Sequence, residues 1–88
     1  SLKQLASLRL ARVALAQEDF AAAKSALARA EGGEYASLYN ELSADLAVAQ
    51  GDLDAARASY RMALETATTQ SRALIQLKLD DIATGDAS

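Results

Sequence analysis

The chain nearly repeats itself. Residues 16–24 read AQEDFAAAK, and the run returns at residues 49–57 as AQGDLDAAR, a shift from residue 16 to residue 49, or 33 residues. A period of this length is typical of stacked helical hairpins, in which each unit buries its apolar face only against a neighbour. Arrays of this kind build interaction surfaces more often than active sites, so the repeat constrains both the fold and the class of function.

The composition favours closely packed helices. Alanine supplies about a quarter of the 88 residues, and aromatic residues supply only 5%. Small side chains allow helices to approach closely, and alanine is the strongest helix former. Proline is absent, so no residue forces a break in a long helix. A chain of this length forms one small domain of modest stability, since it buries only about 60 to 65% of its unfolded surface.

Missing residue types exclude several kinds of chemistry. The chain has no cysteine and no histidine, so it has no disulfide, no Cys/His metal site and no Ser-His or Cys-His catalytic pair. Asp80, Asp81 and Asp86 are the closest approach to a cation site, but adjacent carboxylates on a helix diverge. We therefore expect no catalytic residues, no metal and no cofactor.

The charge pattern argues against nucleic acid as a partner. The net charge is −3, and the nine Lys and Arg are interspersed with acidic residues instead of forming a basic stripe. No segment approaches the roughly 20 apolar residues of a membrane span, and no signal-peptide pattern is present. The chain enters a helical pattern at once, at Leu2, which is typical of a fragment whose anchoring segments lie upstream.

The apolar spacing predicts an all-α fold. Five helices are expected, over residues 2–17, 20–31, 34–50, 53–67 and 70–84. They would form a right-handed α-solenoid fragment, with a first repeat over residues 2–33, a second over 34–68 and a capping helix over 70–84. The whole chain, residues 1–88, is therefore expected to form a single domain.

Turn residues mark the helix boundaries. Asp19 and Asp52 are expected to cap the second and fourth helices, because a carboxylate accepts from the free N–H groups of a first turn. Gly51 is expected to end the third helix, and the pair Gly32-Gly33 the second, in the left-handed conformation that glycine adopts without a Cβ penalty. Thr69 or Ser71 is expected to cap the last helix.

The two end helices differ in their surfaces. The first is apolar almost all round, which predicts either an upstream neighbour or self-association through this helix. The last is expected to have one apolar face, Leu74, Ile75, Leu77, Leu79 and Ile82, opposed by a polar face, Gln76, Lys78, Asp80 and Asp81. A terminal helix of this kind shields the last repeat of an array.

Small residues recur at fixed places in both copies of the repeat. In the second copy they are Ala44, Ala56 and Ala63, with Gly51 and Asp52 at the inner turn and Tyr60 as the large aromatic residue. In the first copy the matching residues are Ala11, Ala23 and Ala30. This pattern resembles the tetratricopeptide repeat, although tryptophan and proline are missing and Glu18 stands where glycine is usual. The resemblance implies a helical array that binds proteins.

A narrower resemblance covers almost the whole chain. The narrower pattern consists of residues 8–13 (LRLARV), 49–52 (AQGD), 55–57 (AAR) and 76–82 (QLKLDDI). It is similar to the C-terminal part of the YfgM-type family, ancillary subunits of the bacterial Sec translocon. The resemblance implies a scaffold anchored in the inner membrane with this domain in the periplasm. Its implied partners are translocon subunits, a periplasmic chaperone and emerging secretory chains. The alternative is a cytoplasmic tetratricopeptide adaptor or regulator, which an upstream membrane span would exclude.

In a tetratricopeptide array the first helix of each repeat lines the concave face. The predicted protein-binding residues there are Leu5, Leu8, Arg12, Leu15, Leu38, Glu41, Asp45 and Val48. Leu8 and Leu42 stand where arrays that grip a carboxylate tail have Lys, Asn or Arg, so a carboxylate clamp is not expected. The expected ligand is an apolar extended or helical peptide. Burial by upstream helices is the alternative use of this face, and Tyr35 and Tyr39 could serve either packing or recognition.

Overall fold

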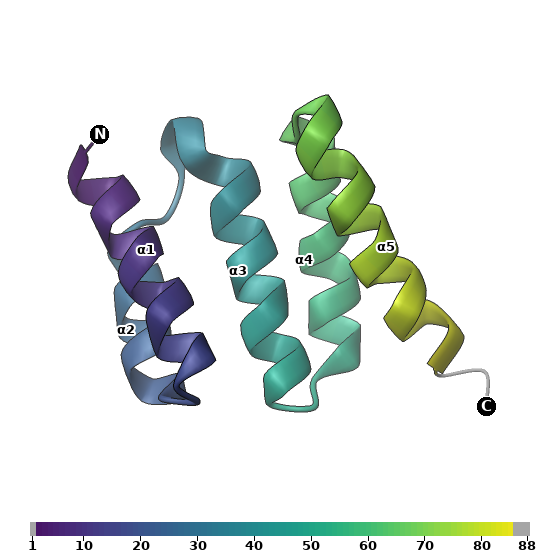
Figure 1. The fold of residues 1–88 in the computed structure, drawn as a ribbon, viewed down its shortest axis with the longest axis horizontal. Helices are drawn as coiled ribbons and strands as arrows, with labels where there is room; N and C mark the ends of the chain where they lie inside the picture. The colour runs from purple at the N-terminus through teal and green to yellow at the C-terminus, as the bar shows by residue number, and fades with distance from the viewer. Residues whose placement is uncertain (1, 86–88) are drawn as a thin grey trace.

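The computed structural model describes residues 2–85, and this part of the chain is helical with short turns. The helices are α1 (Leu2–Ala16), α2 (Phe20–Ala28), a short 3-10 turn η1 (Gly33–Tyr35), α3 (Ala36–Ala49), α4 (Leu53–Thr66) and α5 (Thr69–Gly85). They stand side by side, from α1 and α2 at one end of the molecule to α5 at the other (Figure 1). The expected all-α fold class is confirmed.

The turns within the two helical pairs have the same geometry. Glu18 and Gly51 both adopt a positive φ, of 60° and 82°. In each turn the next residue, an aspartate, donates its N–H to a carbonyl five positions earlier, at 2.8 Å in both cases. The same aspartate then caps the next helix, since Asp19 Oδ1 accepts from Ala22 N and Asp52 Oδ1 from Ala55 N, both at 3.2 Å. One aspartate thus closes one helix and opens the next.

The second helix ends earlier than the sequence suggested. It stops at Ala28 instead of residue 31, because the N–H groups of Arg29 and Ala30 bond three residues back and tighten the last turn. The side chain of Gln4 on α1 then donates to the carbonyl of Ala30 at 2.8 Å, which holds this tight end in place. Gly32 and Gly33 do have positive φ, but they lie in the connection to α3 and do not end the helix.

The cap of α5 is also a different residue from the two expected. Thr68 Oγ1 accepts from the N–H of Ser71 at 3.2 Å, and the Thr68 carbonyl accepts the next bond, from Arg72 N, at 2.8 Å. Thr69 is already inside the helix. Threonine is a good N-cap, so the chain uses the first hydroxyl it reaches after α4.

The core consists of two clusters of buried side chains. The first contains Leu8, Ala11, Ala14, Ala23, Ala26, Leu27, Ala30, Leu42 and Leu46. The second contains Ala44, Ala56, Tyr60, Ala63, Ile75, Leu79 and Ile82. The alanines at the three matching small-residue positions of each copy are all in these clusters, where a small side chain lets two helices approach closely: Ala11, Ala23, Ala30, Ala44, Ala56 and Ala63. Helix α3 contributes to both clusters and therefore joins the two halves.

Tyr35 and Tyr39 are half-buried and pack against the first cluster. Their rings extend the apolar contact between α3 and the first helical pair, which is the packing role left open by the sequence. Part of each tyrosine is removed from water by this contact.

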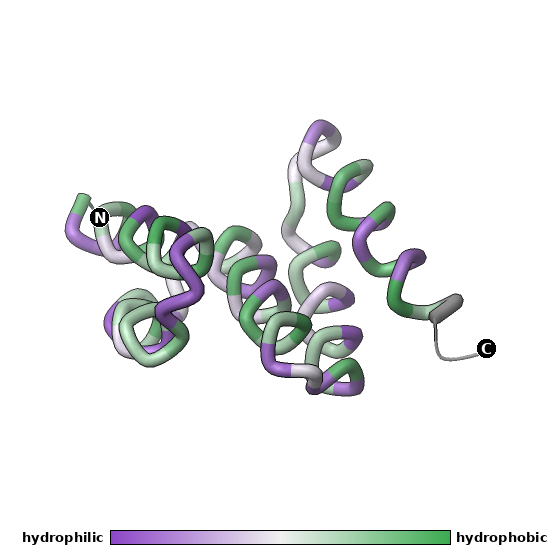
Figure 2. Tube along the Cα trace, turned by 60° about the horizontal axis from the view of Figure 1, so that its bottom comes forward, coloured by the Kyte–Doolittle hydropathy of each residue, from purple (hydrophilic) through white to green (hydrophobic). Residues whose placement is uncertain are grey.

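The last helix distributes its apolar residues over more than one side. Ile75, Leu79 and Ile82 are buried against α4, as a spacing of three and four residues requires. Leu74 and Leu77 are exposed, so the prediction of a single apolar face was wrong. Lys78, expected on the polar face, instead turns toward α3. The hydropathy colouring of Figure 2 shows apolar positions continuing along both α1 and α5.

Candidate protein-binding groove

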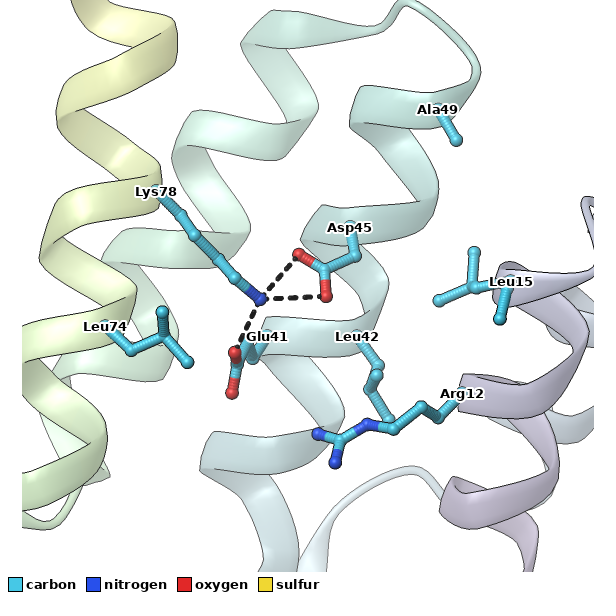
Figure 3. A pocket seen from close by; sticks show the side chains of 9 residues that line it. Arg12, Leu15, Glu41, Leu42, Asp45, Ala49, Leu74 and Lys78 are labelled. Atoms are coloured by element: carbon cyan, nitrogen blue, oxygen red, sulfur yellow. Dashed lines mark hydrogen bonds and ion pairs between the residues drawn. The ribbon is translucent and has the colours of Figure 1, made fainter.

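A groove of about 450 Å³ lies between α1, α3 and α5. Its lining residues are Arg12, Leu15, Ala16, Glu41, Leu42, Asp45, Ala49, Leu74 and Lys78. Figure 3 shows Arg12 and Leu15 approaching from α1, Leu74 and Lys78 approaching from α5, and the α3 side chains between them. The groove is therefore built by three helices that are far apart in the sequence.

An ion-pair cluster occupies the α5 side of this groove. Lys78 Nζ lies 2.8 Å from Glu41 Oε2 and 3.2 Å from Asp45 Oδ2. Glu41 and Asp45 are one helical turn apart on α3, so both carboxylates point to the same side. The hydroxyl of Tyr60 on α4 also donates to Asp45. The cluster thus ties α5 and α4 to α3 through one pair of carboxylates.

The cluster changes the protonation of two of its members. Burial and the hydrogen bond to Asp45 raise the pKa of Tyr60 well above its usual value, so the phenol stays neutral and keeps donating. Partial burial on its own would lower the pKa of Lys78, but the Glu41 hydrogen bond and the Asp45 charge outweigh it and raise this pKa. Lys78 is therefore positively charged at neutral pH.

The opposite side of the groove presents an exposed cation beside apolar side chains. Arg12 is exposed on α1, and no ion pair joins it to any other residue in the described part of the chain. Leu15 beside it is half-buried, and Leu42 forms part of the floor with only 1% of its surface exposed. A ligand in the groove would meet leucine side chains first and the guanidinium at the edge.

The groove contains half of the concave residues that the sequence predicted. Arg12, Leu15, Glu41 and Asp45 line it together. The prediction that Leu8 contacts a partner was wrong. Its exposed fraction is 0%, so it belongs to the first core cluster and presents no surface to a partner.

The other three predicted residues lie outside the groove. Leu5 is half-buried on α1, and Val48 is exposed near the end of α3 without lining the groove. Leu38 lines a smaller, neighbouring hollow of about 260 Å³ between α3 and the start of α5.

Five residues of the groove are not among the predicted protein-binding residues: Ala16, Leu42, Ala49, Leu74 and Lys78. Lys78 and Leu74 lie on α5, which was expected to act only as a shield for the last repeat. The available signal was the pair Glu41 and Asp45, because two acidic residues on one turn of an inward-facing helix need a cation. The repeat pattern did not indicate which lysine or arginine supplies it.

The fold defines a helical-repeat protein. The chain belongs to the tetratricopeptide repeat-like domain family, whose pattern it matches over residues 1–84. Searches of curated proteins and of solved structures returned no significant match. Domains of this family are generally non-catalytic interaction modules, so this domain is a protein–protein interaction module.

The described residues show neither a metal cluster nor a membrane-spanning helix. Within residues 2–85 no three Asp or Glu side chains are grouped so that they could hold a metal ion. Gln76 Nε2 donates to Asp80 on the surface of α5, at 2.9 Å. Asp86, which completed the acidic triplet in the sequence, lies outside the described residues. None of the described helices has both the length and the apolar character needed to cross a bilayer.

Proposed function

We propose that this protein binds an apolar segment of a partner protein in the groove between α1, α3 and α5. The observation that carries the proposal is the composition of the groove, which combines the apolar side chains of Leu15, Ala49 and Leu74 with charged side chains at its edges. Apolar side chains supply most of the free energy of binding, and a few polar groups fix the orientation of the ligand.

The charges of the groove favour a segment with little net charge. The ammonium of Lys78 faces two carboxylates, so that cluster has a net charge of −1, and Arg12 adds one positive charge on the opposite side. The side chains that line the groove therefore have no net charge. A ligand carboxylate would be attracted to Arg12 but repelled by Glu41 and Asp45, so a strongly acidic tail gains little. A neutral, leucine-rich helix or extended segment fits this arrangement best.

Binding in this groove is weak. A volume of about 450 Å³ accommodates only a few side chains of a partner. Interfaces at the small end of the known range give micromolar affinity or poorer, about −8 kcal/mol at best. Affinity of this order suits contacts that form and break repeatedly.

We further propose that the protein acts as a membrane-anchored scaffold on the periplasmic side of the bacterial inner membrane. The support is the similarity of residues 8–13, 49–52, 55–57 and 76–82 to the YfgM-type subunits of the Sec translocon. In this role the groove binds translocon subunits, a periplasmic chaperone or emerging secretory chains. Residue 12 in the first segment and residue 78 in the third both belong to the groove, so the resemblance and the site coincide in part.

The experiment compares two matched surface substitutions. Leu74 in the groove and Met62 on α4 have nearly equal exposed fractions, 51% and 52%. The tagged protein would be incubated with detergent-solubilised inner membranes, and translocon subunits retained by the wild type, Leu74→Asp and Met62→Asp would be quantified. We expect Leu74→Asp to lose at least about tenfold in retained translocon, equivalent to about 1.4 kcal/mol, and Met62→Asp to retain the wild-type amount.

A second measurement separates the groove from the choice of partner. A photo-crosslinking residue at Ala49 lies in the groove, whereas one at Ala58 is exposed on α4. Crosslinks from Ala49 to a protein other than the translocon would support the groove as the binding site but would reject the translocon as its partner. Crosslinks to the translocon from Ala58 alone would reject the groove.

A further inference from the structure

The two ends of the helical array have exposed faces of opposite charge. The α1 end face consists of Leu2, Lys3, Arg9, Leu10 and Val13, and the α5 end face consists of Ala73, Leu77, Asp80 and Asp81, all of them exposed. We infer that copies of this chain associate head to tail, with the α1 end face of one copy packed against the α5 end face of the next. Neither face shares a residue with the groove, so this inference is independent of the proposed function.

The helical spacing places each face on the outside of the array. On α1, Leu8 and Ala11 point into the first core cluster, so Leu2, Arg9 and Val13 lie on the opposite side. On α5, the buried stripe runs through Ile75, Leu79 and Ile82, and residues 73, 77 and 80 lie away from it at a spacing of three and four. Figure 1 shows α1 and α5 at opposite ends of the molecule.

Each end face also has apolar surface that is exposed to water in an isolated copy of the chain. The exposed fraction is 56% for Leu10, 52% for Val13 and 67% for Leu77. Removing such surface from water is favourable in proportion to its area. An apolar strip on a helix, flanked by charged side chains, is typical of a helix that packs against another helix.

The charges decide which end faces meet. The charged residues of α1 are Lys3, Arg9 and Arg12, and no acidic residue lies on that helix. Pairing two α1 end faces would bring cations together, and pairing two α5 end faces would bring Asp80 and Asp81 against their own copies. Head-to-tail contact instead sets the lysine and arginine of one copy beside the aspartates of the next. Complementary charge of this kind selects the partner and its orientation more than it adds affinity.

The contact between two different faces does not close on itself. Association of this type gives open chains, or a ring if the rotation between copies permits it, rather than a symmetric dimer. One helix packed on one helix is a small interface, below the standard size of stable complexes, so the association is weak. Copies concentrated on a membrane or on a shared partner would associate more than copies in dilute solution.

The experiment uses two charge-reversed variants and their mixture. Lys3→Glu/Arg9→Glu gives a chain with two acidic end faces, and Asp80→Lys/Asp81→Lys gives a chain with two basic end faces. Sedimentation equilibrium from about 10 μM to about 1 mM covers the range in which small interfaces associate. We expect the wild type to form species larger than a dimer, each variant alone to remain monomeric, and the equimolar mixture to associate again.

The apolar surface is tested with a matched control. Val13→Asp and Leu77→Asp should each abolish association, whereas Met62→Asp should leave it unchanged, since Met62 is exposed to the same 52% as Val13 but lies on neither end face. Circular dichroism of each variant checks that the helices are intact. Leu15→Asp, in the groove, should leave association unchanged.

Three results would overturn the inference. A monomeric wild type at about 1 mM would show that the end faces do not pair in the accessible range. Association of Asp80→Lys/Asp81→Lys that equals that of the wild type would show that the α5 end face takes no part. Pairing of two α1 helices would give a dimer that becomes stronger when Lys3→Glu/Arg9→Glu is mixed with wild type. The same dimer would be unaffected by Leu77→Asp.

Discussion

Glu18 and Gly51 occupy the same left-handed turn in successive copies of the repeat. Their φ angles are 60° and 82°, and the residues that follow them, Asp19 and Asp52, make the same 2.8 Å backbone hydrogen bond to a carbonyl five positions earlier. A glycine adopts this conformation freely, whereas a residue with a Cβ is strained by about 1 to 2 kcal/mol. The first turn therefore keeps the geometry of the second at a cost in stability.

We expect Glu18→Gly to stabilise the protein. Relief of the strain exceeds the extra entropy of glycine in the unfolded chain, so the free energy of unfolding should rise by about 0.5 to 1 kcal/mol. Urea denaturation followed by circular dichroism measures this change. The converse substitution, Gly51→Ala, should lower the free energy of unfolding by about 1 kcal/mol, although no atom lies within 4 Å of the added Cβ. Equal stabilities for Glu18→Gly and wild type would show that the turn is not strained.

The buried alanines should not tolerate larger side chains. Ala56 has no exposed surface, whereas Ala58 on the same helix is exposed. Ala56→Leu should therefore separate α4 from its neighbours and cost about 1 to 3 kcal/mol, while Ala58→Leu should change stability by less than about 0.5 kcal/mol. Thermal melting of the two variants gives the comparison. Identical melting temperatures for Ala56→Leu and Ala58→Leu would mean that the helices can move apart without loss of stability.

The aspartate caps should contribute equally in the two copies. Asp52 Oδ1 accepts from Ala55 N, and Asp19 Oδ1 from Ala22 N, both at 3.2 Å. Asp52→Ala and Asp19→Ala should each lower the free energy of unfolding by about 0.5 to 2 kcal/mol, because a first-turn N–H loses its acceptor. Asp→Asn at either position should retain most of this stability, since the amide oxygen also accepts. A loss in Asp52→Asn as large as in Asp52→Ala would assign the effect to charge rather than to the hydrogen bond.

Stability should fall at alkaline pH because of Lys78 and Tyr60. The folded state raises both pKa values above their usual 10.5 and 10.0, so it holds these two protons more tightly than the unfolded chain does. The resulting stabilisation is complete below the usual values and is lost as the pH rises through the folded-state values.

Chemical denaturation at several pH values from 7 upward to about 11 tests this expectation. Lys78→Met and Tyr60→Phe should each show a shallower decline than the wild type above about pH 10. Lys3→Met provides the control, since Lys3 is exposed on α1 and makes no contact with the cluster. The prediction would be contradicted if the stability of both Lys78→Met and Tyr60→Phe fell with rising pH as steeply as that of the wild type.

Local features of the fold were predictable from the sequence. The shift from residue 18 to residue 51 preserves a turn whose chemistry lies within a few residues, so the caps and the positive φ follow from the local pattern. The end of α2 was not predictable in this way. It depends on Gln4, which reaches a carbonyl 26 residues away, and no local pattern reports such a contact.

The groove was predictable on two of its three sides. The repeat pattern placed Arg12 on α1 and Glu41 on α3, because equivalent positions of a repeat face the same way. The third side depends on Lys78, which is separated by 37 residues from Glu41 and lies on a helix outside the repeat. The sequence grouped Lys78 with Gln76, Asp80 and Asp81 on a polar face exposed to solvent, whereas its actual environment is set by the two α3 carboxylates that it contacts.

Because α3 contributes to both core clusters, the two halves of the molecule are expected to open separately. Leu42 and Leu46 belong to one cluster and Ala44 to the other, and no residue belongs to both. Detaching α5 exposes the second cluster without disturbing the first, and detaching α1 does the reverse. The chain therefore has two cooperative units that share one helix. Amide exchange should resolve two opening reactions, with α3 exchanging only when both halves have opened.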